Sequence, residues 1–368
     1  MERGKITSFQ LFCLIALFIF GSTSLLQSIT VAGRDSWISH IIAIFAGVFM
    51  GLIITSLAVR FPNQTIIQYT QELFGSIVGK IIGIMYLWYF LHLGALVLRN
   101  YGEFLSNMVL PETPMWFINL TFALVVAYMA AKGIEVIARV GELFWPIIAI
   151  LTIITSILIS ISGHKEIASH LNPVLEHGLT KVILGAVPIA SFPFLEIILF
   201  SMFFPFVNII GKSKNATLAG ILFSGLLLTM ILVQNIAVFG DYLATLTFPR
   251  YFIVRIISVG GFVERIEPLV LAVWLMAGLI KIGICLYAFT LGLSQITGMK
   301  NDKVLIIPTA VLMVVLSLLI YDNTFELLNF AVNIYPVYAF PFQVGLPMLM
   351  LVIAVVRGKG GKKIKECP

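Results

Sequence analysis

Long apolar runs, separated by short polar connections, fill nearly the whole of this 368-residue chain. The hydrocarbon core of a bilayer is about 30 Å thick and needs roughly 20 apolar residues per helical span. A helix suits this environment because every backbone N–H and C=O finds its partner within the same segment. Only 11% of the residues are charged, against roughly 25% in soluble domains. The runs therefore predict an all-α polytopic membrane protein.

Ten spans can be placed from the charges, prolines and glycines that bound the runs. They are predicted at residues 8–31, 39–59, 78–109, 116–131, 142–162, 181–208, 215–239, 267–293, 304–320 and 333–356. The first run follows a basic leader, as in a signal peptide, but it has no clear A-x-A-like cleavage site. We expect an uncleaved first span, a single integral membrane domain over residues 1–368, and a short amphipathic interfacial or re-entrant helix within residues 60–79.

Lysines and arginines concentrate in alternate connections, as they do in cytoplasmic loops. Placing the amino terminus inside puts Arg60, Lys132, Lys212 and the basic tail 357–368 on the same side. Both termini are therefore assigned to the cytoplasm. Because this asymmetry accounts for most of the net charge of +6, we expect the lipid bilayer rather than nucleic acid as the surrounding partner.

Two of the spans contain sequences that interrupt a helix. The first has Gly-Ser-Thr-Ser at residues 21–24, and the sixth has Pro-Ile-Ala-Ser-Phe-Pro at residues 188–193. These are matching places if the chain divides into two five-helix halves, at about 6–162 and 178–356. An odd number of spans makes the second half enter from the opposite face. Inverted repeats with broken first and sixth helices indicate a binding site near the middle of the membrane.

The residues at the breaks suggest which groups would bind there. Pro188 and Pro193 each remove a helical N–H, and Pro193 suits the first turn of a new half-helix near Phe194. Amides at a half-helix amino terminus attract a carboxylate, whereas carbonyls at a carboxyl end suit an amine. We expect residues 22–24 to hold a carboxylate and residues 187–191 an amine, so an amino acid is the first candidate. The alternatives are close packing of small residues at the first break and a simple proline kink at the second.

Ionisable residues also occur within the spans, where they are expensive and usually face the bundle interior. In the third span, His92, Arg99 and Glu103 share one helical stripe, and Arg99 can pair with Glu103. This pair is either functional or a structural ion pair that orients helices.

Two further charges lie deeper in the second half of the chain. Glu196 follows the sixth-span break by one turn, and Lys281 lies near the middle of the eighth span. Lys281 could occupy the position of a coupling cation, pair with Glu196 or close a structural ion pair. The sequence carries no Walker, G-x-S-x-G or H-E-x-x-H motif, so we expect no enzyme, no cofactor and no metal site.

Four stretches of the chain resemble a known family. They are FPNQTIIQYTQELFGSIVGKIIG (61–83), GIEVIARVGELFWP (133–146), LNPVLEHGLTKVILGAVPIASFPFLEIILFSMFFPFV (171–207) and FPRYFIVRIISVGGFVERIEPLVLAVW (248–274). The chain is similar to the B subunit of the Ger-type spore germinant receptors, in the amino acid/polyamine/organocation (APC) transporter superfamily. The resemblance implies a ten-helix inverted-repeat fold in the spore inner membrane, together with an A-type membrane subunit and a C-type lipoprotein.

The resemblance further implies nutrient sensing, in which an amino acid or a similar small-molecule germinant binds and triggers ion and dipicolinate release. The pocket residues carried over by position are Gly21, Ser22, Thr23, Ser24, Tyr89, Leu93, Pro188, Ala190, Ser191, Phe192, Ile280 and Lys281. Ile280 beside Lys281 would shrink and charge one corner of this pocket. The alternatives are a cation- or proton-coupled amino acid permease, which shares the pocket, and a structural membrane partner that binds no small molecule.

Overall fold

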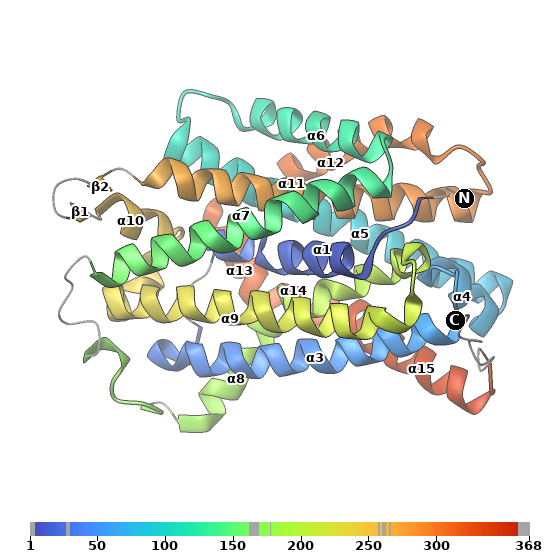
Figure 1. The fold of residues 1–368 in the computed structure, drawn as a ribbon, viewed down its shortest axis with the longest axis horizontal. Coiled ribbons are helices and arrows are strands. Elements are labelled where there is room, and N and C mark those ends of the chain that lie inside the picture. The colour runs from blue at the N-terminus through green and yellow to red at the C-terminus, as the bar shows by residue number, and fades with distance from the viewer. Residues whose placement is uncertain are drawn as a thin grey trace.

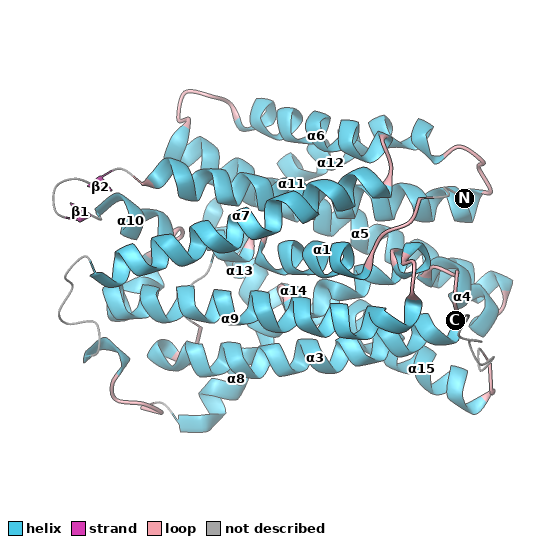
Figure 2. Ribbon diagram, in the orientation of Figure 1, coloured by secondary structure: helices cyan, strands magenta, loops and turns pink. Residues whose placement is uncertain are grey.

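The chain is almost entirely helical, as Figure 2 shows. The computed structural model describes residues 4–26, 30–161, 169–176, 178–256, 258–259, 263–264 and 266–359. Within these ranges the only strands are β1 (Ser258–Val259) and β2 (Val263–Glu264), which pair antiparallel. The prediction of an all-α fold is confirmed. Residues 360–368 of the predicted basic tail lie outside the described residues.

The α-helices are α1 (Ser8–Phe20), α2 (Thr23–Leu26), α3 (Ser36–Arg60), α4 (Ile66–Phe74), α5 (Ser76–Phe104), α6 (Met115–Ala131), α7 (Ile134–Ile161), α8 (Gly178–Ser191), α9 (Ser213–Phe239), α10 (Pro249–Ile256), α11 (Glu267–Thr297), α12 (Ile306–Leu319), α13 (Thr324–Asn329), α14 (Tyr335–Phe340) and α15 (Leu346–Val356). The 3-10 helices are η1 (Gly33–Asp35), η3 (Ser169–Leu171), η4 (Phe194–Met202), η5 (Phe204–Phe206), η6 (Ile210–Lys212), η7 (Gly240–Thr245) and η8 (Asp302–Leu305). Three wider π-helical segments are η2 (Leu105–Val109), η9 (Phe330–Ile334) and η10 (Pro341–Gly345).

Nine helical segments of the described chain are long and apolar enough to cross a membrane. The last of them, Thr324–Val356, joins α13, η9, α14, η10 and α15. Helix α6 is also apolar but has 17 residues, which is the short end of the range for a spanning helix. These segments lie where the sequence placed its ten spans, although α7 begins at Ile134 rather than at residue 142. A tenth crossing and the inverted repeats stay predictions.

Helix α1 lies in the middle of the bundle and packs against α7, α9 and α11 (Figure 1). Every side chain from Cys13 to Phe20 is at most 1% exposed. A helix that is apolar on all sides is expected to be enclosed by other helices. The end of α1, where the sequence predicts the first break, therefore lies in the interior of the protein.

The peripheral helices turn apolar side chains outward. On α7, Ile150, Ile154 and Ile157 share one face of the helix and are 57%, 45% and 54% exposed. Lipid tails cover such a face without the penalty that water would impose, so the surface agrees with residence in a bilayer.

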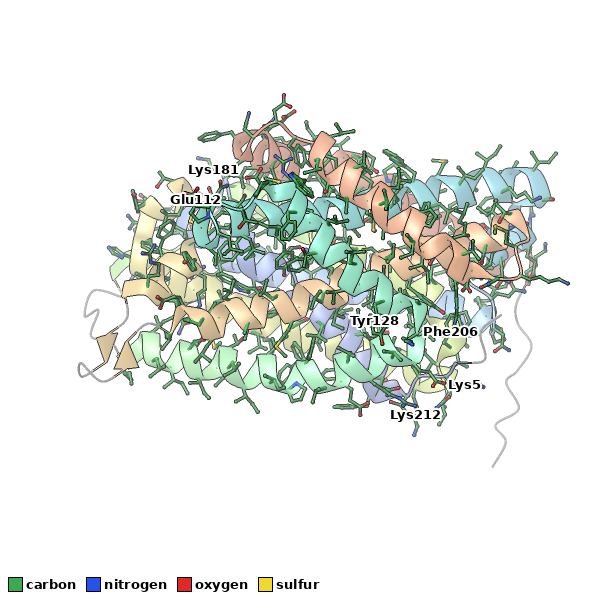
Figure 3. All side chains as sticks on the ribbon, turned by 90° about the horizontal axis from the view of Figure 1, so that it is seen from above. Lys5, Glu112, Tyr128, Lys181, Phe206 and Lys212 are labelled. Carbon is green, nitrogen blue, oxygen red and sulfur yellow. The ribbon has the colours of Figure 1, made fainter. Side chains whose placement is uncertain are left out.

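Four charged residues labelled in Figure 3 mark the two ends of the bundle. Lys5 and Lys212 lie at one end, and Glu112 and Lys181 lie at the other (Figure 3). Helices α1 and α9 therefore start at the same end, whereas α8 starts at the opposite end. This alternation agrees with the predicted order of the spans, and the assignment of the Lys5 end to the cytoplasm stays a prediction.

The amphipathic stretch after α3 forms the nine-residue helix α4, which is too short to span. Thr65 and Gln68 cap its amino terminus, and the Arg357 guanidinium donates to the carbonyl oxygen of Leu73 at its carboxyl end (2.8 Å). Because Arg357 directly follows α15, this hydrogen bond ties the last helix to α4.

Candidate functional site

The first helix breaks at Gly21 and Ser22, between α1 and α2. The Gly21 N–H still donates to the carbonyl oxygen of Leu17 (2.8 Å), and the Ser24 hydroxyl donates to the carbonyl oxygen of Gly21 (3.0 Å). By contrast, the hydroxyls of Ser22 and Thr23 are buried and make no hydrogen bond to any residue that the structure describes. Buried hydroxyls without partners are unfavourable, so a polar ligand at this break would satisfy groups that the protein leaves open.

The sixth span breaks between α8 and η4. Helix α8 continues through Pro188 to Ser191, and the Phe192 N–H donates to the carbonyl oxygen of Pro188 (3.0 Å). Within the interruption predicted at residues 188–193, Pro188 does not stop the helix, because proline removes only its own N–H while its carbonyl still accepts. Pro193 ends the helix instead, since it has no N–H for the carbonyl of Ile189 and disfavours helical dihedral angles at Phe192.

Beyond this break the chain forms η4, a nine-residue 3-10 helix, where the sequence predicts an α-helical half-helix. Glu196 lies in its first turn, and its side chain is fully buried. The residues of η4 all lie in the core, which encloses the carboxylate on every side.

Glu196 meets Lys281 of α11 in the centre of the protein. The Lys281 Nζ lies 2.7 Å from Glu196 Oε2, and both side chains are 0% exposed. The same ammonium lies over the rings of Phe18 and Phe192, at 4.8 and 4.5 Å from their centroids. Of the three alternatives for Lys281, the structure shows the pair with Glu196. Cation–π contacts with both rings add to its stabilisation.

Gly21 brings the first break against this ion pair. A Cβ atom at residue 21 would lie 2.8 Å from Cδ and 3.3 Å from Cβ of Lys281. Only a residue without a side chain allows the lysine stem to cross at this distance. The two breaks therefore converge on Lys281, because Phe192 of the second break also contacts its ammonium.

A chain of hydrogen bonds extends from the ion pair to the third and last spans. The Tyr335 hydroxyl donates to Glu196 Oε1 (2.7 Å), and it lies 3.1 Å from the Tyr89 hydroxyl. Gln343 Nε2 donates to the Tyr89 oxygen and to the carbonyl oxygen of Ser191, both at 2.8 Å. Residues from α5, α8, η4, α11 and the last span thus share one buried polar network.

This network has only one consistent direction. Because a carbonyl oxygen can only accept, Gln343 must turn its amide nitrogen toward Ser191 and donate to Tyr89. Tyr89 then donates to Tyr335, and Tyr335 donates to Glu196. If Glu196 were protonated and donated to Tyr335, the Tyr89 proton would lose its acceptor in this chain. In this direction the Tyr335 hydroxyl donates to Glu196 Oε1 and the Lys281 Nζ donates to Oε2, so both carboxylate oxygens are engaged.

The order of the donors leads to a prediction for Tyr335. Replacing Tyr335 by phenylalanine removes a donor to Glu196 and the acceptor of Tyr89, so we expect a loss of about 1–3 kcal/mol in unfolding free energy. The matched control is Tyr101→Phe, because the Tyr101 hydroxyl is buried without a partner and its removal should be neutral or stabilising. Thermal unfolding of the purified protein in detergent measures both. Equal stability of Tyr335→Phe and Tyr101→Phe would contradict the ordered chain.

A cavity of about 120 Å³ lies beside the two breaks. It is lined by Thr23, Leu26, Thr30, His40, Pro188, Ile189, Phe192, Leu232, Leu328, Ala331 and Val332. A smaller cavity of about 30 Å³ shares Leu26, Phe192 and Ala331 with it and also borders Tyr335. Ligand pockets for drug-sized molecules are usually about 300–1,000 Å³. This space suits a much smaller molecule, with mostly apolar walls and with Thr23, Thr30 and His40 as its polar lining residues.

The predicted Arg99–Glu103 pair forms at a different place. Arg99 donates to Glu103 Oε1 from Nε (2.9 Å) and Nη2 (2.6 Å), and to the carbonyl oxygens of Ser317 and Leu318 at the end of α12. Glu103 Oε2 accepts from Asn107 and Thr324, both at 2.9 Å. All of these groups are mutually satisfied, so the geometry agrees with the structural alternative, in which the pair holds α12 and α13 against α5.

The remaining predicted residues lie near these groups without joining their hydrogen bonds. His92 is stacked on Trp88 and meets Tyr338 edge to face, and its Nδ1 has no partner. It is therefore not linked to Arg99 or Glu103 by any hydrogen bond. Leu93 and Ile280 are fully buried, and Ala190 is 8% exposed.

Tyr335 and Gln343 were missed at the sequence level. Both are polar residues within the last apolar run, which is a signal for an interior-facing position in a membrane. Their joint role could not be deduced, because they are eight residues apart, about 80° around a regular helix, and the sequence does not show which neighbouring spans they face. The π-helical segment η10, which contains Gln343, changes this spacing.

Comparisons with known proteins identify a family for this chain. A family model described as "Spore germination protein" matches residues 5–325. Spore germination protein KB of Bacillus subtilis (strain 168) is 30% identical over 368 residues, which cover 99% of this chain and 98% of that protein. Spore germination protein YndE of the same organism is 30% identical over 369 residues, covering 98% of this chain and 99% of the relative.

Solved structures share the fold at low sequence identity. MhsT in complex with L-phenylalanine has a TM-score of 0.67 at 14% identity and covers 95% of this chain and 89% of that chain. Mhp1, a nucleobase-cation-symport-1 family transporter, has a TM-score of 0.60 at 12% identity, with coverages of 96% and 79%. A Na⁺-coupled sialic acid symporter gives 0.63 at 9%, with coverages of 97% and 89%. The fold is therefore that of APC-type transporters.

Proposed function

The chain belongs to the spore germination protein family, and on that premise we propose that it is the nutrient-sensing membrane subunit of a germinant receptor. The observation that carries the proposal is the convergence of both helix breaks on the buried Lys281–Glu196 pair, next to a cavity. Such breaks in a membrane bundle are maintained only where protein or ligand satisfies the freed backbone groups.

The germinant in this proposal is a small molecule bound beside the breaks, with an amino acid as the first candidate. The unpartnered Ser22 and Thr23 hydroxyls would bind its polar end. The apolar wall around Pro188, Ile189 and Phe192 would contact its side chain. Binding changes the balance between conformations only to the extent that the ligand prefers one of them. In this proposal the ligand prefers one conformation because it binds at the breaks, where it would touch α2 and α8 together.

The proposal also covers the location of the protein, its orientation in the membrane and its partner subunits. We assign it to the spore inner membrane as a multi-pass protein with both termini in the cytoplasm, assembled with an A-type membrane subunit and a C-type lipoprotein. The fold of the family and the position of Lys5 and Lys212 at one end support this arrangement. The two five-helix repeats of a single domain belong to the same proposal.

A cation- or proton-coupled amino acid permease is the second candidate. The observation in its favour is the likeness in fold to transporters, two of which are described as a cation symporter and a Na⁺-coupled symporter. Against cation coupling at this place, the Lys281 ammonium already neutralises Glu196. Net flux separates the two functions, because a sensor binds its ligand without concentrating it.

The decisive experiment combines a binding screen with an uptake assay. Amino acids, nucleosides and sugars are screened by thermal shift on the purified protein, and each hit is tested for uptake into proteoliposomes. We expect at least one stabilising compound and no concentrative uptake. Binding with concentrative uptake would make the protein a permease, and no binding in the complete receptor complex would favour a structural membrane partner.

The open hydroxyls at the first break give a sharper prediction for the same assay. In Ser22→Ala and Thr23→Ala we expect the affinity for the stabilising compound to fall about tenfold, which corresponds to about 1.4 kcal/mol. Stability without ligand should be unchanged or higher, because each substitution removes a buried group that has no partner. Thr217→Ala is the control. Its buried hydroxyl also lacks a partner among the described residues, but it lies four residues after the start of α9, near the Lys212 end of the bundle rather than at the first break. Equal affinity in all three variants would show that the ligand does not bind at the first break.

A further inference from the structure

Another buried cation, besides Lys281 and Arg99, lies at the end of the bundle that carries α10. Arg250, on α10, is 3% exposed. Its Nη1 donates to Gln234 Oε1 and its Nη2 donates to Ser156 Oγ, both at 2.8 Å. Both partners are neutral, so neither contact balances the positive charge. Burial lowers the pKa of Arg250 to about 9, and the guanidinium therefore remains charged near pH 7.

Among the residues that the structure describes, no carboxylate supplies the missing charge. The ion pairs among the described residues are Arg34–Asp241, Arg99–Glu103, Arg139–Glu135 and Lys281–Glu196. Arg250 is a member of none of them. A buried charge without a counter-charge is strongly destabilising. The fold therefore places a full positive charge in its interior and leaves it to be neutralised by something other than its own carboxylates.

A small cavity adjoins this guanidinium. Its volume is about 10 Å³, and its lining includes Phe20, Thr152, Thr155, Arg250 and Trp274. A space of about 10–15 Å³ accommodates one water-sized particle. A carboxylate or phosphate group would not fit, which leaves a single-atom ion; a halide, which is larger than a water molecule, would need the lining side chains to move apart slightly.

Hydrogen-bond donors remain at this cavity. A guanidinium has five N–H donors, and only two of those of Arg250 are engaged. Among the lining residues, the Thr155 hydroxyl donates to the carbonyl oxygen of Thr152 (3.0 Å), while the Thr152 side chain makes no hydrogen bond in the described structure. Unused donors around a buried positive charge are the chemistry that binds an anion.

We propose that Arg250 and Thr152 bind one monovalent anion of halide size at this cavity. The charge, the unused donors and the volume all lead to the same class of ligand. This site goes beyond the germinant proposal, because it lies in a different cavity and needs no germinant. Trp274 precedes Lys281 by seven residues on α11, which is about 10 Å along the helix axis.

The position of the anion connects it to the first break. The lining combines α1, α7, α9, α10 and α11, and Phe20 is the last residue of α1 before Gly21. Helix α10 also packs against α2, directly after that break. A bound anion would therefore hold α10 against the bundle and stabilise the packing around the first break.

Thermal unfolding in different sodium salts at equal ionic strength tests the proposal. In chloride or bromide we expect the midpoint to rise by roughly 2–4 °C above its value in gluconate, with a saturable dependence on halide concentration. Gluconate is too large for the cavity. Arg250→Gln should lose the halide effect, whereas Arg34→Gln, which removes an arginine already paired with Asp241, should keep it. Equal midpoints of the natural protein in chloride and gluconate, or a full halide effect in Arg250→Gln, would overturn the site.

A measurement on the unaltered protein covers the case in which Arg250→Gln does not fold. Equilibrium binding of radioactive chloride should saturate at about one ion per chain and be displaced by unlabelled bromide. Absence of saturable binding would overturn the proposal. Germinant binding can fail in the screen described above without affecting either outcome.

Discussion

Replacing Lys281 by methionine should lower the unfolding free energy by about 3–5 kcal/mol, because it leaves the carboxylate of Glu196 buried without its counter-charge. Glu196→Gln should have a similar effect through the uncompensated ammonium. The double variant Lys281→Met/Glu196→Gln should recover most of the loss, since a neutral pair in the same place has no charge to compensate. Unfolding midpoints and yields of monodisperse protein in detergent measure the three variants.

The control for this cycle is the exposed pair between Arg139 and Glu135, whose nitrogen and oxygen are 3.6 Å apart. Glu135→Gln should change stability by less than about 0.5 kcal/mol, as exposed helical pairs usually do. If the double variant were as unstable as either single one, the pair would matter through its shape rather than through its charge. If Lys281→Met alone were as stable as the natural protein, the buried ion pair would carry no stability.

The second large effect is expected at Gly21. Gly21→Ala places a methyl group 2.8 Å from Cδ of Lys281, whose ammonium is fixed by Glu196 and two aromatic rings. Overpacking of this kind typically costs about 1–3 kcal/mol, and we expect the germinant-induced thermal shift to be lost as well. Gly345→Ala is the matched control, because the nearest non-local atom to a Cβ added there is the Phe340 carbonyl oxygen, at 3.8 Å. That variant should be neutral or slightly stabilising, as alanine usually is within a helix.

An undiminished ligand response in Gly21→Ala would show that the approach of Lys281 to the first break is not needed for binding. Loss of response in both glycine variants would indicate a general effect on packing. The informative result is loss in Gly21→Ala alone, with the protein still folded and monodisperse.

Much of the fold could be predicted because it follows from the bilayer. Apolar runs of the required length specify the helices, and the Gly-Ser-Thr-Ser segment specifies the break after α1. The i, i+4 spacing of Arg99 and Glu103 specifies their pair, because neighbours on one helix need no tertiary information. Each of these predictions depends on residues close together in the sequence.

The contacts at the candidate site depend on residues far apart and could be predicted only in part. A pair between Lys281 and Glu196 was one of three alternatives, since nothing in the sequence sets the distance between α11 and η4. The sequence placed the sixth-span break only within residues 188–193, and it could not show that the helix continues past Pro188 to Ser191. Tyr335 and Gln343 meet Tyr89 from a last span whose irregular geometry its sequence does not show.

That irregularity has a mechanical consequence. A π-helical turn holds more residues than an α-helical turn, and such turns often occur at functional sites. Tyr335 begins α14, which lies between the wide turns η9 and η10. If η9 moved along the chain by one residue, Tyr335 would rotate by about 100° around the helix axis while the backbone remained hydrogen-bonded. A rotation of that size would break the hydrogen bond between Tyr335 and Glu196, so the position of η9 along the last span controls whether this contact forms.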